Sequence, residues 1–191
     1  MPGSTVFSEY ELRKMSIKVG EEGQYKSADC VGSCEEEMET KVVTKSCRGV
    51  VAKTRVWGTG NGTLNISAHM PMDIYHDVFG MMADDLLEGV YAYGQPSVHP
   101  TFSITQEVYD EDGNKKFKAY PNCIMQSGVA RSIENGAEEV AEIEMEVSVM
   151  PDEEGFGLYE ALESELTDET AKTTWMTAFT PELVKKSVPG I

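Results

Sequence analysis

The most regular pattern of hydrophobic and polar positions lies in residues 138–150, EEVAEIEMEVSVM. Glu142, Glu144 and Glu146 share one parity, and the apolar residues share the other: Ile143, Met145, Val147 and Val149. Successive side chains of a strand point to opposite faces, so this alternation is typical of a strand with one dry and one wet face. We therefore predict a strand over 138–150 that has an acidic wet face and ends at Pro151.

Further strands are indicated by runs of β-branched and apolar residues between turn-forming residues. We predict them at 40–48, 50–57, 63–68, 101–109 and 115–124. The last two flank Asp110-Glu-Asp-Gly-Asn114, and Asp-Gly is a strong hairpin signal because both residues tolerate positive φ. A calcium-binding EF-hand loop is excluded there, because its glycine position is Lys115 and its bidentate glutamate position is Pro121.

Two helices and a closing strand complete the expected elements. Pro71 suits the first turn of a helix, where its missing N–H costs nothing. The apolar residues after it recur at steps of three and four and predict one buried helix face: Met72, Tyr75, Phe79, Met82 and Leu86. We predict a second short helix over 158–166 and a last strand over 173–179.

These elements predict a mainly β fold: a β-sandwich or partly closed barrel, with one or two short flanking α-helices and extended N- and C-terminal arms. The 191 residues fit one domain. We place it at 41–180, between an N-terminal extension (1–40) and a C-terminal arm (181–191). The two polar ends of the chain, 1–40 and 167–191, carry apolar residues without the length for a core, so we expect these residues to contact other subunits. They are Phe7, Tyr10, Trp175, Phe179, Leu183 and Val184.

The charge balance limits the partners. The chain has 33 acidic against 16 basic residues, a net charge of −17, and such a surface repels nucleic acid backbones and anionic membranes. Its N-terminus lacks the apolar core of a signal peptide, and no apolar run approaches membrane-spanning length. We therefore expect a protein that is made in a cytosol, is not exported by the usual route and has no membrane partner.

Candidate chemistry is scarce. Gly58, Gly60 and Gly62 do not match a dinucleotide loop, because the third glycine comes one position early and a strand is predicted next. We interpret them as a bend from one strand into the next. Neither G-x-S-x-G nor H-E-x-x-H occurs, and the histidines at 69, 76 and 99 have no catalytic spacing. We predict no enzymatic activity, no catalytic residue and no cofactor.

The four cysteines at 30, 34, 47 and 123 show no second close pair and no histidine at zinc-ligand spacing. We expect free thiols and no metal. Two other functions stay open at this point. One is a metal-dependent enzyme that uses Cys30, Cys34 and Cys47, and the other is a small-ligand-binding β-barrel module, which the 11 methionines and the β content suggest.

The acidic face of the strand 138–150 suggests a use. Neighbouring carboxylates on one strand face lie roughly 6.5–7 Å apart and repel each other. If identical subunits closed into a ring with this face inward, Glu142, Glu144 and Glu146 would line a negatively charged bore. DNA that passed through such a bore would find no stable contacts and would slide.

The chain resembles the major tail (tail tube) proteins of bacteriophages with long, non-contractile tails. The resemblance runs from about residue 40 to 180 and rests on short stretches: HMPMD at 69–73, Phe79-Gly80, the hairpin arm 102–109, AYPNC at 119–123, VMPDEE at 149–154 and YEA at 159–161. It implies a structural subunit with no active site.

The resemblance further implies stacked, hexameric rings that form a tube around the tape measure protein and later conduct the genome. The implied partners are other copies of the chain, the tape measure, the tail terminator and the distal tail protein, with only transient passage of DNA. The implied location is the virion tail, assembled in the host bacterial cytoplasm. The inner tubes of contractile tails and of type VI secretion systems share this architecture and stay open as alternatives.

Overall fold

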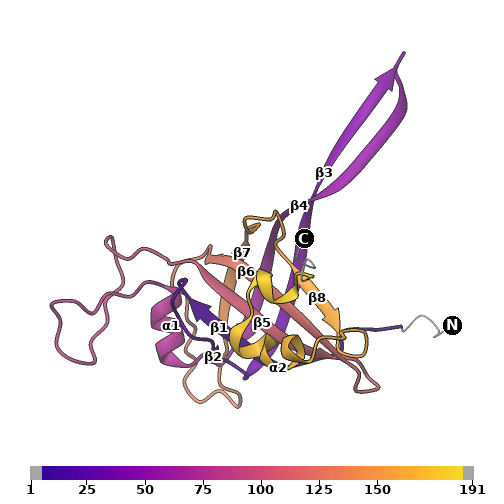
Figure 1. Ribbon diagram of the computed structural model, residues 1–191. Helices are drawn as coiled ribbons and strands as arrows, with labels where there is room; N and C mark the ends of the chain where they lie inside the picture. Colours follow the sequence, from indigo (N-terminus) through magenta and orange to yellow (C-terminus); the bar gives the residue numbers. More distant parts are fainter. Residues whose placement is uncertain (1–5, 187–191) are drawn as a thin grey trace.

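Eight strands form one antiparallel sheet in the computed structural model, which describes residues 6–186 (Figure 1). The order along the sheet is β2-β1-β5-β6-β7-β4-β3, and β8 pairs with the first half of β6. The strands are β1 (Glu11–Val19), β2 (Lys26–Ser27), β3 (Val31–Cys47), β4 (Val50–Ala68), β5 (Phe102–Tyr109), β6 (Lys115–Met125), β7 (Ile143–Val149) and β8 (Tyr159–Leu162). The prediction of a mainly β fold with short flanking helices is confirmed.

The sheet curls so that β1, the second strand at one end, approaches β3 at the other end, which makes it a partly closed barrel. On β5, the Gln106 side chain donates to Cys34 Sγ of β3 at 3.4 Å, across the interior. The interior is filled by apolar side chains from six elements, among them Met15, Leu64, Ile104, Met145 and Val147. Because β7 pairs with β4 in the register Leu64↔Val147, the apolar rows of the two strands meet inside.

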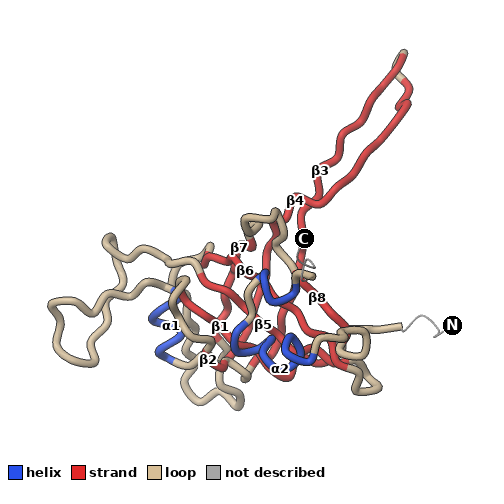
Figure 2. Tube along the Cα trace, in the orientation of Figure 1, coloured by secondary structure: helices blue, strands red, loops and turns tan. Residues whose placement is uncertain are grey.

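The helices cover the barrel at two places (Figure 2). Helix α1 (Met72–Val78) contributes Ile74, Tyr75 and Val78 to the main core. Helix α2 (Glu169–Ala178) begins at Asp168, whose carboxylate accepts from the N–H of Ala171 at 2.9 Å. It packs on the outside of β6, and a 3₁₀ turn, η1 (Pro181–Val184), follows it.

Helix α1 is shorter than predicted. Phe79 is buried just after it, and Gly80 turns the chain with a φ of 57°. Met82 and Leu86, predicted on the same helix face, therefore lie in the exposed loop that follows. Met72 is also half-exposed.

Two predicted elements have the opposite structure. Residues 173–179 form most of α2 instead of a strand, and residues 159–162 form strand β8 instead of a helix. Strand β8 is hydrogen-bonded to β6, which is distant from it in the sequence. A local hydrophobic pattern carries no information about such a distant partner.

The boundaries of the ends also differ from the prediction. Strand β1 lies within the segment 1–40 that we predicted as an extension, and its Met15 and Ile17 are buried in the core. The strand predicted over 138–150 begins only at Ile143. At the other end, the predicted arm starts with η1, and residues 187–191 lie outside the described residues.

The three alternate glycines do not separate two strands. They lie inside one continuous strand, β4, opposite a register shift in β3 between Met38 and Thr40. Gly60 has a φ of 81°, and a Cβ there would lie 2.7 Å from the carbonyl oxygen of Gly155. Gly60 thus lets the loop over 151–157 cross closely over β4 at the point where the β3–β4 hairpin leaves the barrel.

Candidate functional site

Two exposed surfaces stand out on this barrel, and one of them contains the predicted acidic strand. Glu144 and Glu146 of β7 are exposed, whereas Met145 and Val147 between them are buried. The pairing registers extend this surface over β4 to β3, since Asn65 has Glu146 on one side and Glu35 on the other. We call this surface the acidic face, and it consists of Glu35, Glu37, Glu142, Glu144 and Glu146.

Glu35 and Glu37 were missed by the sequence analysis, which assigned the acidic run 35–39 to an extension. In β3 the even positions Cys34 and Met38 pack against the core, and the odd positions face water. The alternation is hidden because the inward position 36 is also a glutamate. The weak signal that could have revealed this strand is the pair Cys34 and Met38, two apolar residues four positions apart.

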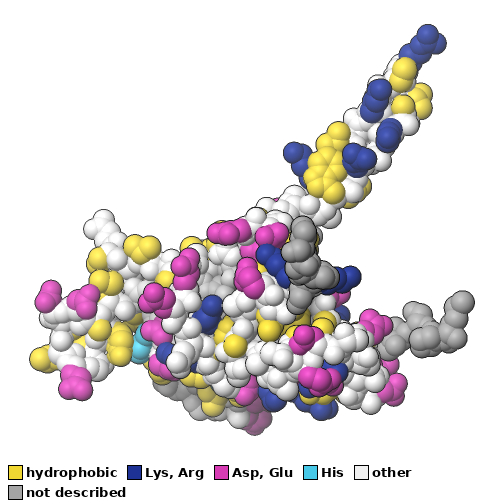
Figure 3. Space-filling view, viewed as in Figure 1, with side chains coloured by type: hydrophobic (Ala, Val, Ile, Leu, Met, Phe, Trp, Pro, Cys, Tyr) yellow, Lys and Arg dark blue, Asp and Glu magenta, His cyan; other side chains and the backbone are white. Residues whose placement is uncertain are grey.

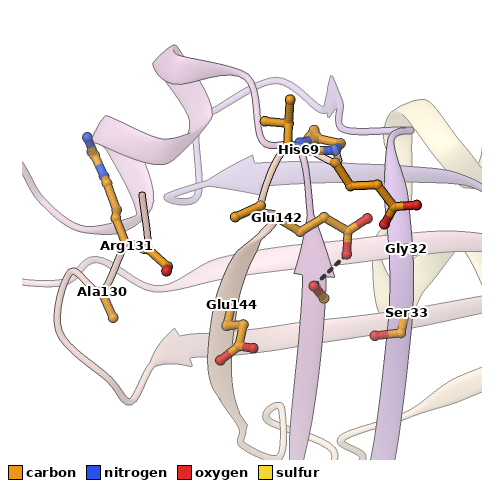
Figure 4. Close-up of a pocket in the computed structure, with 12 residues that line it drawn as sticks. Gly32, Ser33, His69, Ala130, Arg131, Glu142 and Glu144 are labelled. Atoms are coloured by element: carbon orange, nitrogen blue, oxygen red, sulfur yellow. Dashed lines mark hydrogen bonds between the residues drawn. The ribbon is translucent and has the colours of Figure 1, made fainter. Parts of the chain in front are cut away.

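Glu142 is fixed more firmly than its neighbours. It precedes β7, and its carboxylate accepts from Ser67 Oγ at 2.6 Å (Figure 4). It lies against the backbone of Gly32, where a Cβ would collide with the carboxylate oxygens. The glycine therefore allows Glu142 to pack over β3, beside an open hollow of about 1100 Å³ whose lining also includes His69 and Arg131.

Glu36 has the parity of Cys34 and Met38 on β3, and its partly exposed side chain belongs to an ionic cluster around the buried Lys118 at one end of the barrel. Its carboxylate pairs with the ammonium of Lys118 and accepts from the Tyr120 hydroxyl. Lys118 is 4% exposed and also contacts Glu9 at 3.3 Å. Burial, with the Glu36 charge adding to it, raises the pKa of Tyr120 well above its usual value, so the phenol stays protonated and donates.

Glu9 connects the N-terminal segment to this cluster. It accepts from Lys116 Nζ at 2.8 Å, and Lys116 also lies 5.0 Å from the centre of the Phe7 ring. Partial burial works to raise the pKa of Glu9, but the two lysines outweigh it and lower the pKa below its ordinary value. The charge on Glu9 therefore stabilises the segment against the barrel.

The second exposed surface is the outer part of the β3–β4 hairpin, residues 41–57, which we call the arm. It projects from the barrel as a two-stranded ribbon, and every one of its residues is exposed (Figure 3). Pairing continues from Lys41↔Trp57 to Cys47↔Val50, over a length of roughly 25 Å. Six large hydrophobic side chains of the arm are between 42% and 69% exposed: Val42, Val43, Val50, Val51, Val56 and Trp57.

The arm is also the basic part of an acidic protein. It holds five basic and no acidic residues, so its charge is +5 and that of the remaining chain is −17 − 5 = −22. Lys45 and Lys53 are register partners, and like charges directly opposite each other destabilise a ribbon by roughly 0.2–1 kcal/mol. An isolated two-stranded hairpin is at best marginally stable in water. A partner with acidic and apolar groups would offset both costs.

The predicted subunit-contact residues separate into two groups. Trp175 and Phe179 are buried in the protein's own core. The centroid of the Trp175 ring lies 5.5 Å from that of the stacked Phe117 ring and 4.8 Å from that of the Phe179 ring. At 1% and 2% exposure, Trp175 and Phe179 leave little surface for a contact with another subunit. Leu183 and Val184 pack partly against the same cluster. Phe7 is half-buried and Tyr10 is 75% exposed, so these two stay predictions.

The four cysteines are free, with Cys30 and Cys47 exposed and Cys123 buried. Burial raises the pKa of the Cys34 and Cys123 thiols, which makes both poor nucleophiles at neutral pH. Among residues 6–186, no group of three His, Cys, Asp or Glu side chains is placed to hold a metal ion. No helix in the same part of the chain is long and apolar enough to cross a membrane.

No family model and no curated protein matches the sequence. Among solved structures, the fold is similar to the anti-feeding prophage cap, described as the tube-terminating cap, determined by cryo-electron microscopy. The two chains are 9% identical, the similarity covers 85% of this chain and 99% of that chain, and the TM-score is 0.48. A similarity at this level leaves the function to be derived from the surfaces described above.

Proposed function

We propose that the chain is a structural subunit of a phage tail tube, which self-assembles into stacked hexameric rings around a negatively charged lumen. The observation that carries this proposal is the arm, a basic and apolar ribbon that no described part of its own chain covers. Exposed apolar surface of this kind usually belongs to an interface. A protein of charge −22 outside the arm offers the arm a suitable partner in further copies of itself.

The acidic face supplies the second half of the proposal. Its carboxylates lie on a regular sheet surface with Ser33, Asn65 and Ser67 between them. A wall of this composition repels the phosphates of DNA. We therefore assign Glu142, Glu144 and Glu146, together with Glu35 and Glu37, to the lumen.

On this proposal the protein lies in the virion tail after assembly in the host cytoplasm. Its partners are the tape measure during assembly, the terminator and distal tail proteins at the tube ends, and DNA in passage. No catalytic step is assigned to it.

Electron microscopy of the purified full chain tests the proposal. We expect rings or tubes at micromolar concentrations and moderate salt. A second test uses virions that carry Glu144→Lys and Glu146→Lys, with Glu144→Gln and Glu146→Gln as the uncharged control. Tubes should form in both cases, and genome delivery should be slowed most by lysine. A chain that stays monomeric at every concentration and salt contradicts the proposal, and normal delivery with lysine removes the lumen assignment alone.

A further inference from the structure

A long loop between α1 and β5 has the charge opposite to that of the arm. Residues 82–98 contain Asp84, Asp85 and Glu88 and no lysine or arginine. We call this segment the acidic loop. In Figure 1 it lies at the far left of the molecule, whereas the arm extends at the upper right.

The acidic loop is held in a defined position at its base. Met82 and Ala92 form a two-way backbone bridge, with N–H to carbonyl distances of 2.9 and 2.8 Å. The Tyr91 ring stacks on His76 of α1 at 3.8 Å. Compact surface loops whose two ends lie close together are packed by their own side chains and are frequently functional. The tip of the loop is therefore presented to solvent in an ordered way.

The acidic loop also exposes apolar side chains next to its acids. Leu87 is 83% exposed, and Leu86, Val90 and Tyr91 are each more than two-fifths exposed. These four residues thus offer aliphatic or aromatic contacts close in sequence to three carboxylates. This composition mirrors the arm, where valines and Trp57 alternate with lysine and arginine.

We propose that the arm of one copy docks on the acidic loop of the next copy. This inference rests on the proposed function and identifies the surface through which the subunits join. The acidic loop is the complementary surface for the arm, because the arm has a charge of +5 and the loop a charge of −3. Both surfaces also expose apolar side chains. The acidic face could attract the same lysines, but its outward neutral neighbours, such as Ser33, Asn65 and Ser67, are polar and would leave the valines uncovered.

The position of the two surfaces limits the symmetry of the contact. The arm and the acidic loop are different patches, so two copies joined by one docking contact still have one free arm and one free loop. Repetition of that contact gives closed rings or open helical filaments, whereas a two-fold pair would have to dock both arms at once. The proposed tube uses the repeating arrangement.

Charge exchange between the two surfaces tests the inference. The arm variant carries Lys45→Glu, Lys53→Glu and Arg55→Glu, which change the charge of the arm from +5 to 5 − 6 = −1. The loop variant carries Asp84→Lys and Glu88→Lys, which change the charge of the loop from −3 to −3 + 4 = +1. Each alone should need at least about tenfold more protein to assemble than the wild type, as measured by sedimentation velocity and negative-stain microscopy. An equimolar mixture of the two variants should assemble again, because each then supplies a surface that the other lacks.

The matched control places the lysines on the acidic face, as Glu144→Lys and Glu146→Lys, and mixes that variant with the arm variant. Circular dichroism and thermal unfolding verify that every variant is folded before mixing. Rescue by the loop variant alone supports the inference. Rescue by the acidic-face variant, or by neither while the wild type assembles, overturns it and leaves the proposed function standing. Wild-type protein that never assembles contradicts the proposed function itself.

Discussion

Strands β3 and β4 run through two environments, and their two halves can be compared within one hydrogen-bonded ribbon. In the barrel half, the inward positions pair as Cys34↔Ile66 and Met38↔Gly62, and they pack against the core. In the arm, the same ladder continues with Val42↔Val56, and both side chains are more than half exposed. The backbone is alike in both halves, but only the barrel half has a surface to bury its side chains against.

The charges divide in the same place. The barrel halves of β3 and β4 carry glutamates outside and one glutamate, Glu36, inside. The arm halves carry only lysine and arginine. Inside the barrel a charge is paired within the chain, whereas on the arm the like charges of Lys45 and Lys53 face each other. This difference is the physical basis of the proposal that the arm docks on another molecule.

The two tryptophans of the chain give the sharpest test of this comparison. Trp175 is buried and its indole N–H donates to the carbonyl of Lys118 at 3.1 Å. Trp175→Ala should lower the free energy of unfolding by about 3–5 kcal/mol, measured by urea unfolding of dilute, monomeric protein. Trp57→Ala on the arm should change it by less than about 0.5 kcal/mol. Equal losses for the two variants would mean that the arm packs on its own barrel.

The lysines give the next largest difference. Lys118→Met leaves the inward carboxylate of Glu36 without its cation, so we expect a loss of about 2–3 kcal/mol in urea unfolding. Adding Glu36→Gln should recover most of that loss, because the unpaired charge is then gone and the amide oxygen can still accept from the Tyr120 hydroxyl. Lys45→Met on the arm removes one of two facing like charges and should be neutral or slightly stabilising. A double variant no better than Lys118→Met would show that packing, and not charge, dominates the cluster.

The sequence predicted those parts of the fold in which a local pattern decides the structure. The alternation of Glu144 and Glu146 with Met145 and Val147 gave the right faces for β7. The hairpin at Asp110 was also correct, since the Asp110 carboxylate accepts from the N–H of Asn114 at 2.7 Å and closes the turn. In both cases the signal lies within a few residues of its consequence.

The sequence failed where distant contacts decide. Residues 173–179 were predicted as a strand, but α2 forms because Trp175 and Phe179 bury one side against Phe117 of β6. The acidic run in β3 hid its strand, because Glu36 is paired with Lys118, 82 positions later in the chain. The arm was predicted as strands at 40–48 and 50–57. That no other described part of the chain packs against these strands depends on the tertiary structure, which the local sequence does not reveal.

The glycines at the base of the arm test where the two halves meet. Gly60→Ala introduces a Cβ at positive φ and 2.7 Å from the Gly155 carbonyl, so we expect a loss of roughly 1–3 kcal/mol in thermal or urea unfolding. Gly58→Ala is the matched control, because no atom lies within 4 Å of its Cβ, and it should change stability by less than about 0.5 kcal/mol. If both changes were neutral, the loop over 151–157 would not brace the arm.

Acid should weaken the barrel and leave the arm unaffected, which is the smallest of these effects. The pKa of Glu9 is lower in the folded protein than its ordinary value of 4.5, because Lys116 and Lys118 outweigh its partial burial. A lowered carboxyl pKa contributes stability that is present above pH 4.5 and is lost as the pH falls through the folded pKa. For a pair this exposed the contribution is about 0.2–1 kcal/mol.

The urea midpoints of wild type and Glu9→Gln should therefore differ between about pH 5 and pH 7, where the Glu9 carboxylate is charged, and should converge in more acid solution. Lys45→Met should differ from wild type by the same amount at every pH, since Lys45 faces only the Lys53 ammonium across the ribbon. A constant gap for Glu9→Gln would show that its carboxylate is not what holds the N-terminal segment to the barrel.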